Sequence, residues 1–315
     1  MDSYTQTIRD LSSALLKDGK VDMVIGFKAG TVPMATCPQV VRTPEQAQTL
    51  IWDSSCALNL ANYLTNRKEK IGIIAKGCDS RNIITHIIEN KITREQLHII
   101  GVPCTGMVDR AAVAASVGHE ITACEEMDGT LLVTTAQGRA SILKSDVLKD
   151  NCRTCMHRNP VIYDDLAGEL VTEPVLDDPF ADVKAIEAMN TQEKWDMFDS
   201  LLKDCIRCYA CRNACPLCYC PTCFVDESSP QWVGKGQDAT DVRTFHFLRA
   251  FHCAGRCTDC GACEQACPMG IKVRHFTRKL VKDSFEIYGW EAGLTLNQRP
   301  PLDTFKPEDP DEFIK

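Results

Sequence analysis

Four closely spaced cysteines occur twice in this chain, with the same spacing each time. The first run consists of Cys205, Cys208, Cys211 and Cys215. The second run consists of Cys257, Cys260, Cys263 and Cys267. Both read C-x2-C-x2-C-x3-C and end in a proline. Three cysteines on one turn can present their thiolates to one side, as a cubane iron–sulfur cluster requires, so the repeat predicts two 4Fe–4S clusters.

The fourth cysteine of each run is expected to face away from the first three. In two-cluster ferredoxins, this cysteine ligates the other cluster. We therefore assign the first cluster to Cys205, Cys208, Cys211 and Cys267. The second cluster is assigned to Cys257, Cys260, Cys263 and Cys215. Zinc ribbons are the alternative, but they use paired C-x2-C units rather than four cysteines with a trailing proline.

An apolar segment with helical periodicity, 242–254, lies between the two runs. Together with the runs, it resembles the helical ferredoxin domains of heterodisulfide reductase and succinate dehydrogenase iron–sulfur subunits. The resemblance covers about residues 200–275. It implies a mainly α-helical domain at 199–280 that carries two 4Fe–4S clusters.

Further cysteines stand close to these runs. They are Cys218, Cys220, Cys223 and Cys253. Their density favours one more cluster or a zinc ion, for which four thiolates are a common ligand set. The alternative is that some of them are buried cysteines that act as small apolar side chains.

Composition limits where such a protein works. The chain has 19 cysteines and no basic, apolar leader at its start, so we expect a cytoplasmic protein whose thiols stay reduced and bind metal. The net charge of −8 argues against nucleic acid as a partner. No run of about 18 apolar residues occurs, so no membrane span is expected.

The first half of the chain alternates apolar strands with helical patterns. Strands are expected at 21–27, 71–75 and 97–102, and helices at 3–17, 43–66 and 79–90. A polar loop is expected after the first strand, and a hairpin at 131–143. This alternation predicts an α/β domain at 1–156 with a small, mainly parallel sheet.

The remaining segments connect or follow these two domains. Residues 157–198 are expected to form an acidic, proline-rich linker and a helix that runs from 183 to about 203. Residues 281–315 are expected to form a C-terminal arm, which is extended after Pro300.

Three short motifs in the first half carry cysteines. Lys76-Gly-Cys78-Asp-Ser-Arg81 follows a strand and opens a helix, with Asp79 or Ser80 as candidate N-cap. Lys76 and Arg81 would flank that helix N-terminus, which makes them candidates for binding a flavin phosphate; an ordinary surface turn is the alternative. Val-Pro-Cys104-Thr-Gly ends the next strand, and Cys152-x2-Cys155 follows the hairpin.

In this order, the three motifs resemble the beta-subunit family of deazaflavin-coenzyme hydrogenases and dehydrogenases, over about residues 20–160. The resemblance implies FAD or FMN, a 4Fe–4S cluster, and electron transfer between the flavin and a partner enzyme. Carried over by position, it implies a third cluster on Cys78, Cys104, Cys152 and Cys155. The alternative is that these cysteines are structural.

We therefore predict an iron–sulfur electron-transfer subunit of an anaerobic oxidoreductase complex, of the hydrogenase, formate dehydrogenase or heterodisulfide-reductase type. Its partners would be the other subunits. No nucleophile–base pair or acid–base dyad stands out, so no catalytic residue is assigned, and whether the chain is itself an enzyme stays open. A self-sufficient flavoenzyme that oxidises a reduced coenzyme and a zinc-stabilised scaffold are the alternatives.

Overall fold

The computed structural model describes residues 2–303, and the chain divides into two compact units. The first unit holds the residues up to Arg81 and Asn90–Leu176. The second unit holds Asn82–Glu89 and the residues from Asp177 onward. Of the arm predicted after Pro300, residues 304–315 lie outside the described part.

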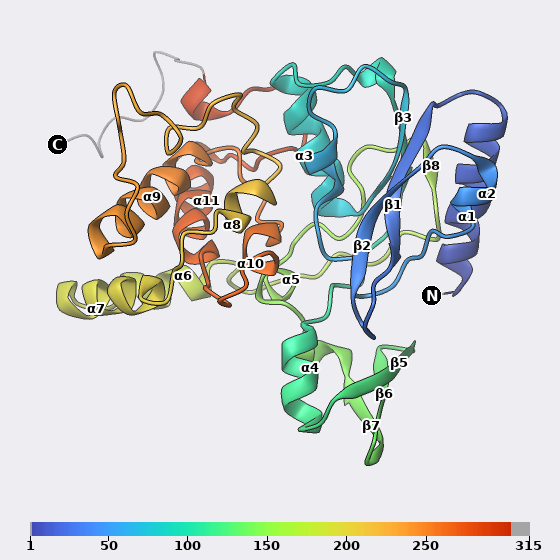
Figure 1. The fold of residues 1–315 in the computed structure, drawn as a ribbon, viewed down its shortest axis with the longest axis horizontal. Coiled ribbons are helices and arrows are strands. Elements are labelled where there is room, and N and C mark those ends of the chain that lie inside the picture. Colours follow the sequence, from blue (N-terminus) through green and yellow to red (C-terminus); the bar gives the residue numbers. More distant parts are fainter. Residues whose placement is uncertain (1, 304–315) are drawn as a thin grey trace. The chain divides into compact units, whose positions relative to one another are not determined.

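A five-stranded sheet organises the first unit, in the order β2-β1-β3-β4-β8 (Figure 1). Its strands are β1 (Met23–Ala29), β2 (Thr36–Val41), β3 (Ile71–Ala75), β4 (Leu97–Gly101) and β8 (Asp165–Leu166). Only β2 runs antiparallel to its neighbour. The predicted α/β domain with a small, mainly parallel sheet is therefore confirmed.

The helices of this unit are short, apart from two. They are α1 (Asp2–Lys17), α2 (Pro44–Ala47), α3 (Gly77–Ile88), α4 (Arg110–Val117), α5 (Asp150–Arg153), and the 3-10 turns η1 (Leu60–Tyr63), η2 (Arg94–Gln96) and η3 (Lys144–Val147). The first five residues of α3 belong to this unit and the rest to the second. Every residue of β3 is buried, as expected for a strand with neighbours on both sides.

The helix predicted at 43–66 is wrong. Thr43 does cap a helix, since its hydroxyl accepts a hydrogen bond from the Gln46 amide, but α2 lasts one turn. Beyond it, the amide of Ile51 donates to the carbonyl of Phe27 in β1 at 2.9 Å. The Asp53 carboxylate then accepts from the Ser55 amide at 2.6 Å. Such local side-chain bonds compete with the helix, and this one keeps the segment irregular.

Two strands were also missed. The segment read as a polar loop contains β2, at the sheet edge, where Pro38 is tolerated. The segment read as a linker contributes β8, which pairs with β4 over only two residues.

A separate three-stranded meander follows α4. Its strands are β5 (Ile121–Met127), β6 (Thr130–Thr135) and β7 (Gly138–Leu143). The predicted hairpin is therefore confirmed, and β5 extends it to a third strand. The buried side chains of Val113, Ile121, Leu131 and Val133 form its small core.

The second unit is built from helices. They are α6 (Ala181–Glu187), α7 (Thr191–Leu202), α8 (Ala210–Asn213), α9 (Ala239–His252), α10 (Ala262–Gln265), α11 (Arg274–Tyr288) and the 3-10 turn η4 (Pro301–Asp303). The predicted helix at 242–254 is present as α9. The helix expected at 183–203 is split into α6 and α7, because Asn190 caps a new helix through the Glu193 amide. No helix within residues 2–303 has the length and apolar character that a membrane crossing needs.

Candidate metal centres

The two cysteine runs adopt the same backbone, residue for residue. Between the first and second cysteines, Arg207 and Asp259 have positive φ angles of 49° and 57°. Between the second and third cysteines, Tyr209 and Gly261 have φ angles of 60° and 70°. A four-residue helix follows each loop, α8 in the first run and α10 in the second. Three of these four positions hold non-glycine residues in the left-handed region, a strained conformation that clusters at functional sites.

The first three cysteines of the first run lie near the last cysteine of the second. Burial raises the pKa of the Cys205 thiol, and the neighbouring Cys267 and Cys208 raise it further. The pKa of Cys211 is likewise raised, chiefly by burial and then by Cys205 and Cys267. The structure thus brings together the four residues assigned to the first cluster.

The reciprocal group forms around Cys215. Burial raises the pKa of Cys263, and Cys215, Cys260 and Cys257 add to that rise. Burial, Asp259 and Cys215 raise the pKa of Cys257 to about 11. All four thiols line one small cavity, with a volume of about 20 Å³. The four residues assigned to the second cluster are therefore brought together around one cavity.

Backbone amides point at several of these sulfurs. The Asp259 amide donates to Cys257 Sγ at 3.4 Å, and the Ile271 amide donates to Cys267 Sγ at 3.4 Å. Hydrogen bonds of this kind stabilise the charged form of a sulfur ligand. Buried thiols with raised pKa values do not ionise without a counter-charge, which a metal provides. Within residues 2–303, no three His, Cys, Asp or Glu side chains converge on a single point where one metal ion could sit.

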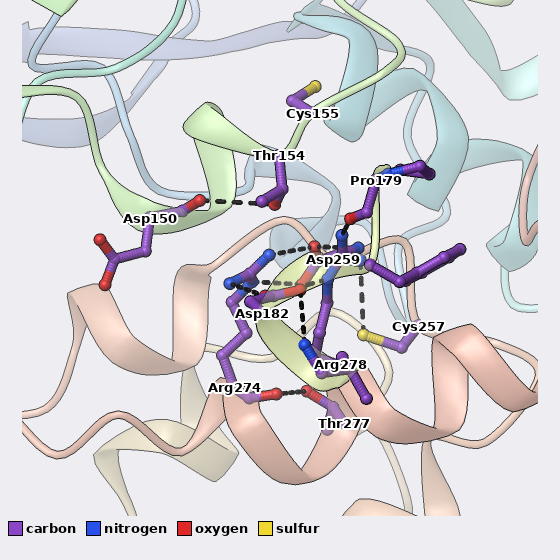
Figure 2. Close-up of polar contacts among 12 residues, drawn as sticks. Asp150, Thr154, Cys155, Pro179, Asp182, Cys257, Asp259, Arg274, Thr277 and Arg278 are labelled. Carbon is purple, nitrogen blue, oxygen red and sulfur yellow. Dashed lines mark hydrogen bonds and ion pairs between the residues drawn. The ribbon is translucent and has the colours of Figure 1, made fainter. Parts of the chain in front are cut away.

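An ion-pair network holds the loop of the second run (Figure 2). The Asp259 carboxylate contacts the Arg274 guanidinium at 2.6 Å and the Arg278 guanidinium at 2.9 Å. Both arginines are buried, and both also reach Asp182 of α6 at 3.5 Å. The network ties the strained residue between Cys257 and Cys260 to α11.

Two residues near the first run escaped the sequence analysis. His246 places its Nε2 3.3 Å from Cys205 Sγ. Burial and then Arg249 lower the pKa of His246 to about 4, so the imidazole is neutral near pH 7 and can donate to the sulfur. Arg249 is 3% exposed and donates to the Cys211 carbonyl at 3.0 Å. A sequence signal existed: Arg249 falls seven residues after Val242, on the apolar stripe of α9.

The additional cysteines between the runs separate into different surroundings. Cys218 and Cys253 lie beside each other and beside Cys215, whose pKa they lower. Cys223 lies beside Arg212, and Cys220 is exposed. Two of the four residues grouped by the sequence thus lie beside the second cysteine set.

In the first unit, the segment after α5 folds back onto the carboxyl ends of the strands. The Cys104 amide donates to the Arg158 carbonyl at 3.0 Å, and the Arg158 guanidinium donates to the Cys152 carbonyl at 3.1 Å. Gly77 permits this approach, because a Cβ at that position would lie 2.3 Å from the His157 carbonyl oxygen. The sequence alone gave no sign of this return.

The return brings three of the four predicted cysteines of this unit, Cys104, Cys152 and Cys155, near one another. Burial raises the pKa of Cys104, with Cys155 adding to it. Burial also raises the pKa of Cys152, with Cys104 adding to it. The Gly106 amide donates to Cys104 Sγ and the Met107 amide to Cys152 Sγ, each at 3.3 Å. These amide–sulfur bonds repeat the pattern of the second unit.

The two basic residues proposed for a phosphate face this cysteine group instead. Lys76 is 2% exposed, and its ammonium contacts the Asp79 carboxylate at 2.8 Å and the Leu58 carbonyl at 2.8 Å. Burial opposes its charge, but Asp79 and then Cys78 raise the pKa of Lys76 above its ordinary value. Arg81 is buried and lowers the pKa of Cys155, against the larger effect of burial. Because α3 begins at Gly77, Asp79 lies in its first turn and is not its N-cap.

Two cavities of this unit share one glutamate. One has a volume of about 490 Å³ and is lined by Trp52, Asp53 and Glu126, among others. The other, of about 530 Å³, is lined by Tyr4, Thr105 and Glu126, among others. Lys144 contacts both Glu126 and Thr105 at 2.7 Å, next to Cys104. The second cavity is therefore lined by the residue that follows Cys104 in the chain, Thr105.

Sequence comparison finds relatives of nearly the same length. No model of a known protein family matches the chain. The F420-dependent formate dehydrogenase subunit beta of Methanocaldococcus jannaschii is 24% identical, over 91% of each chain. The beta subunit of F420-dependent formate dehydrogenase 1 of Methanococcus maripaludis is 24% identical, over 91% of this chain and 90% of that one.

Among solved structures, a chain of the F420-reducing NiFe hydrogenase complex of Methanosarcina barkeri aligns with a TM-score of 0.38 at 16% identity. The alignment covers 48% of this chain and 58% of the hydrogenase chain.

Proposed function

Since this chain is a homologue of the beta subunits of F420-dependent formate dehydrogenases, we propose that it is the iron–sulfur electron-transfer subunit of an anaerobic oxidoreductase complex. In this role it relays electrons between the site where a partner subunit oxidises formate or hydrogen and the deazaflavin coenzyme F420. The near-complete coverage of both relatives supports a shared role for the whole chain, rather than for one domain of it.

The observation that carries the proposal is the crossed grouping of the two cysteine runs on a duplicated backbone. Each set takes three thiols from one run and one from the other. Clusters held in this way share the short helices α8 and α10, so they lie close together. A 4Fe–4S cluster supplies one-electron transfer when bound, and its potential depends on hydrogen bonds and charge around the sulfurs.

The chain's own residues provide that environment. Amides of the strained loops donate to cysteine sulfurs, and Asp259 anchors one loop to α11. Phe245 and Val242 pack in one apolar cluster with Cys211, Cys205 and Cys267 and keep water away from these three members of the first set. Exclusion of water strengthens every charge interaction at the sulfurs.

We extend the proposal to a third cluster on Cys78, Cys104, Cys152 and Cys155. The return of the Cys152–Cys155 segment to the strand ends supports it, as do the two amide–sulfur hydrogen bonds. Lys76 and Arg81 then offset part of the negative charge of four thiolates in a buried site.

A flavin is the second part of the proposal. The cavities that share Glu126 have the size of a small-molecule site, and one of them is lined by Thr105, the residue after Cys104. A flavin bound there would exchange electrons with a cluster at short range. The buried Lys76 does not bind its phosphate, because the ammonium is engaged with Asp79.

Anaerobic purification from the native source tests the function. The expected result is a complex in which this chain co-purifies with a catalytic subunit, and in which F420 is reduced at the expense of formate or hydrogen. Isolation alone, with stoichiometric flavin and unaided oxidation of reduced coenzyme, would instead establish a self-sufficient flavoenzyme. Zinc in place of iron would establish a scaffold.

A further inference from the structure

Arg249 is a buried cation without a carboxylate partner. It lies on α9, is 3% exposed, and donates one guanidinium hydrogen bond, to the Cys211 carbonyl at 3.0 Å. Its Nε has no hydrogen-bond partner. Among the described residues, no Asp or Glu forms an ion pair with it. A buried charge is costly unless it is paired, so its counter-charge must come from other groups.

The groups around Arg249 are cysteines of both sets. Its guanidinium lines the cavity formed with Cys215, Cys257 and Cys263. Its hydrogen bond runs to Cys211, a member of the other set. Burial opposes its charge, but Cys215 and then Cys263 raise the pKa of Arg249. One fixed positive charge is thus positioned between the two sets of thiols.

We propose that Arg249 is a positioning residue that raises the reduction potentials of both clusters of the second unit. The inference rests on the proposed function, since it requires clusters at both sets. Reduction adds one negative charge to a cluster, and a cation in a buried site stabilises the reduced form. Because the same guanidinium reaches both sets, its removal lowers both potentials together.

The test compares three variants of the full-length protein, purified without oxygen. Arg249→Gln removes the charge but keeps a donor, and Arg249→Lys keeps the charge. Arg243→Gln is the matched control on the same helix, where the arginine is paired with Asp199 and stacked on Trp195. Iron and acid-labile sulfide are counted first, and the potentials are then measured by redox titration monitored by EPR.

The expected result is a negative shift of both midpoint potentials in Arg249→Gln, a much smaller shift in Arg249→Lys, and none in Arg243→Gln. Loss of iron in Arg249→Gln but not in Arg249→Lys would also support the proposal. Both variants lack the guanidinium, and only Arg249→Gln lacks the positive charge. Unchanged potentials in a fully loaded Arg249→Gln would overturn it. Equal loss of iron in both Arg249 variants would also overturn the proposal, because the guanidinium would then have a purely steric role. Absence of iron from the wild-type protein would instead refute the proposed function.

Discussion

The buried pair of Lys76 and Asp79 gives the sharpest stability prediction. The Asp79 side chain is fully buried and accepts three hydrogen bonds. They come from the Lys76 ammonium at 2.8 Å, the Lys76 amide at 3.1 Å and the Leu60 amide at 3.0 Å. Asp79→Ala removes the acceptor of all three bonds and leaves the buried Lys76 ammonium with its hydrogen bond to the Leu58 carbonyl at 2.8 Å.

Removal of one partner of a buried ion pair costs about 3–5 kcal/mol, because the other charge is left unpaired. We expect Asp79→Ala to destabilise the first unit by this amount. Lys76→Met combined with Asp79→Leu should cost far less, since replacing a buried pair by apolar residues is often nearly neutral. A larger loss of unfolding free energy in Asp79→Ala than in the double variant would therefore reflect the unpaired Lys76 charge rather than the loss of contacts in general.

Urea unfolding of the full-length protein under reducing conditions, followed by circular dichroism, measures the effect. Asp178→Ala is the matched control, because Asp178 contacts Lys184 at 2.9 Å on the exposed surface. Surface pairs contribute little, so no measurable change is expected there. A cost below about 1 kcal/mol for Asp79→Ala would refute the account of this pair.

Three further changes test the cysteine sets and the charge network. Cys152→Ala should release about four iron atoms per chain and leave the rest; unchanged iron content would make the first unit's cysteines structural. Cys215→Ser should alter the EPR signal of the cluster on the second run more than that of the first; the reverse pattern would contradict the crossed assignment. Burial opposes ionisation of Glu89, but the hydrogen bonds from Arg256 and Tyr219 lower its pKa overall. The stability that Glu89 contributes is therefore present above its unfolded pKa and lost as pH falls through the lower folded value, below about pH 4.3. In Glu89→Gln, the free energy of unfolding should therefore fall less steeply as the pH is lowered through that range. An unchanged pH dependence would count against the role of this pair.

Sequence patterns predicted the helices and strands that are determined by residues close together in the chain. The strand expected at 71–75 follows from its apolar run and is present, and the helix expected at 79–90 is present from Gly77 to Ile88, although neither candidate N-cap caps it. The prediction of a helix over 43–66 was wrong because two hydrogen bonds compete with it. The bond from the Ser55 amide to the Asp53 carboxylate is local, and the bond from the Ile51 amide to the Phe27 carbonyl is not. The edge strand β2 carries a proline, which sequence reasoning treats as a breaker.

The candidate site divides in the same way. The duplicated spacing identified which cysteines to group, because cluster geometry constrains short loops. The environment of the sulfurs could not be deduced, since His246 and Arg249 reach the cysteines only through the packing of α9. Lys76 was expected to be a candidate phosphate ligand, because its partner Asp79, three residues along, binds it only once α3 has formed.

A metal count tests most directly whether the duplicated spacing of these cysteines serves iron–sulfur clusters. The protein purified without oxygen should contain about twelve iron and twelve acid-labile sulfide per chain, eight from the second unit and four from the first. Dithionite should convert EPR-silent oxidised clusters into paramagnetic ones. Stoichiometric zinc with little iron or sulfide would contradict the account.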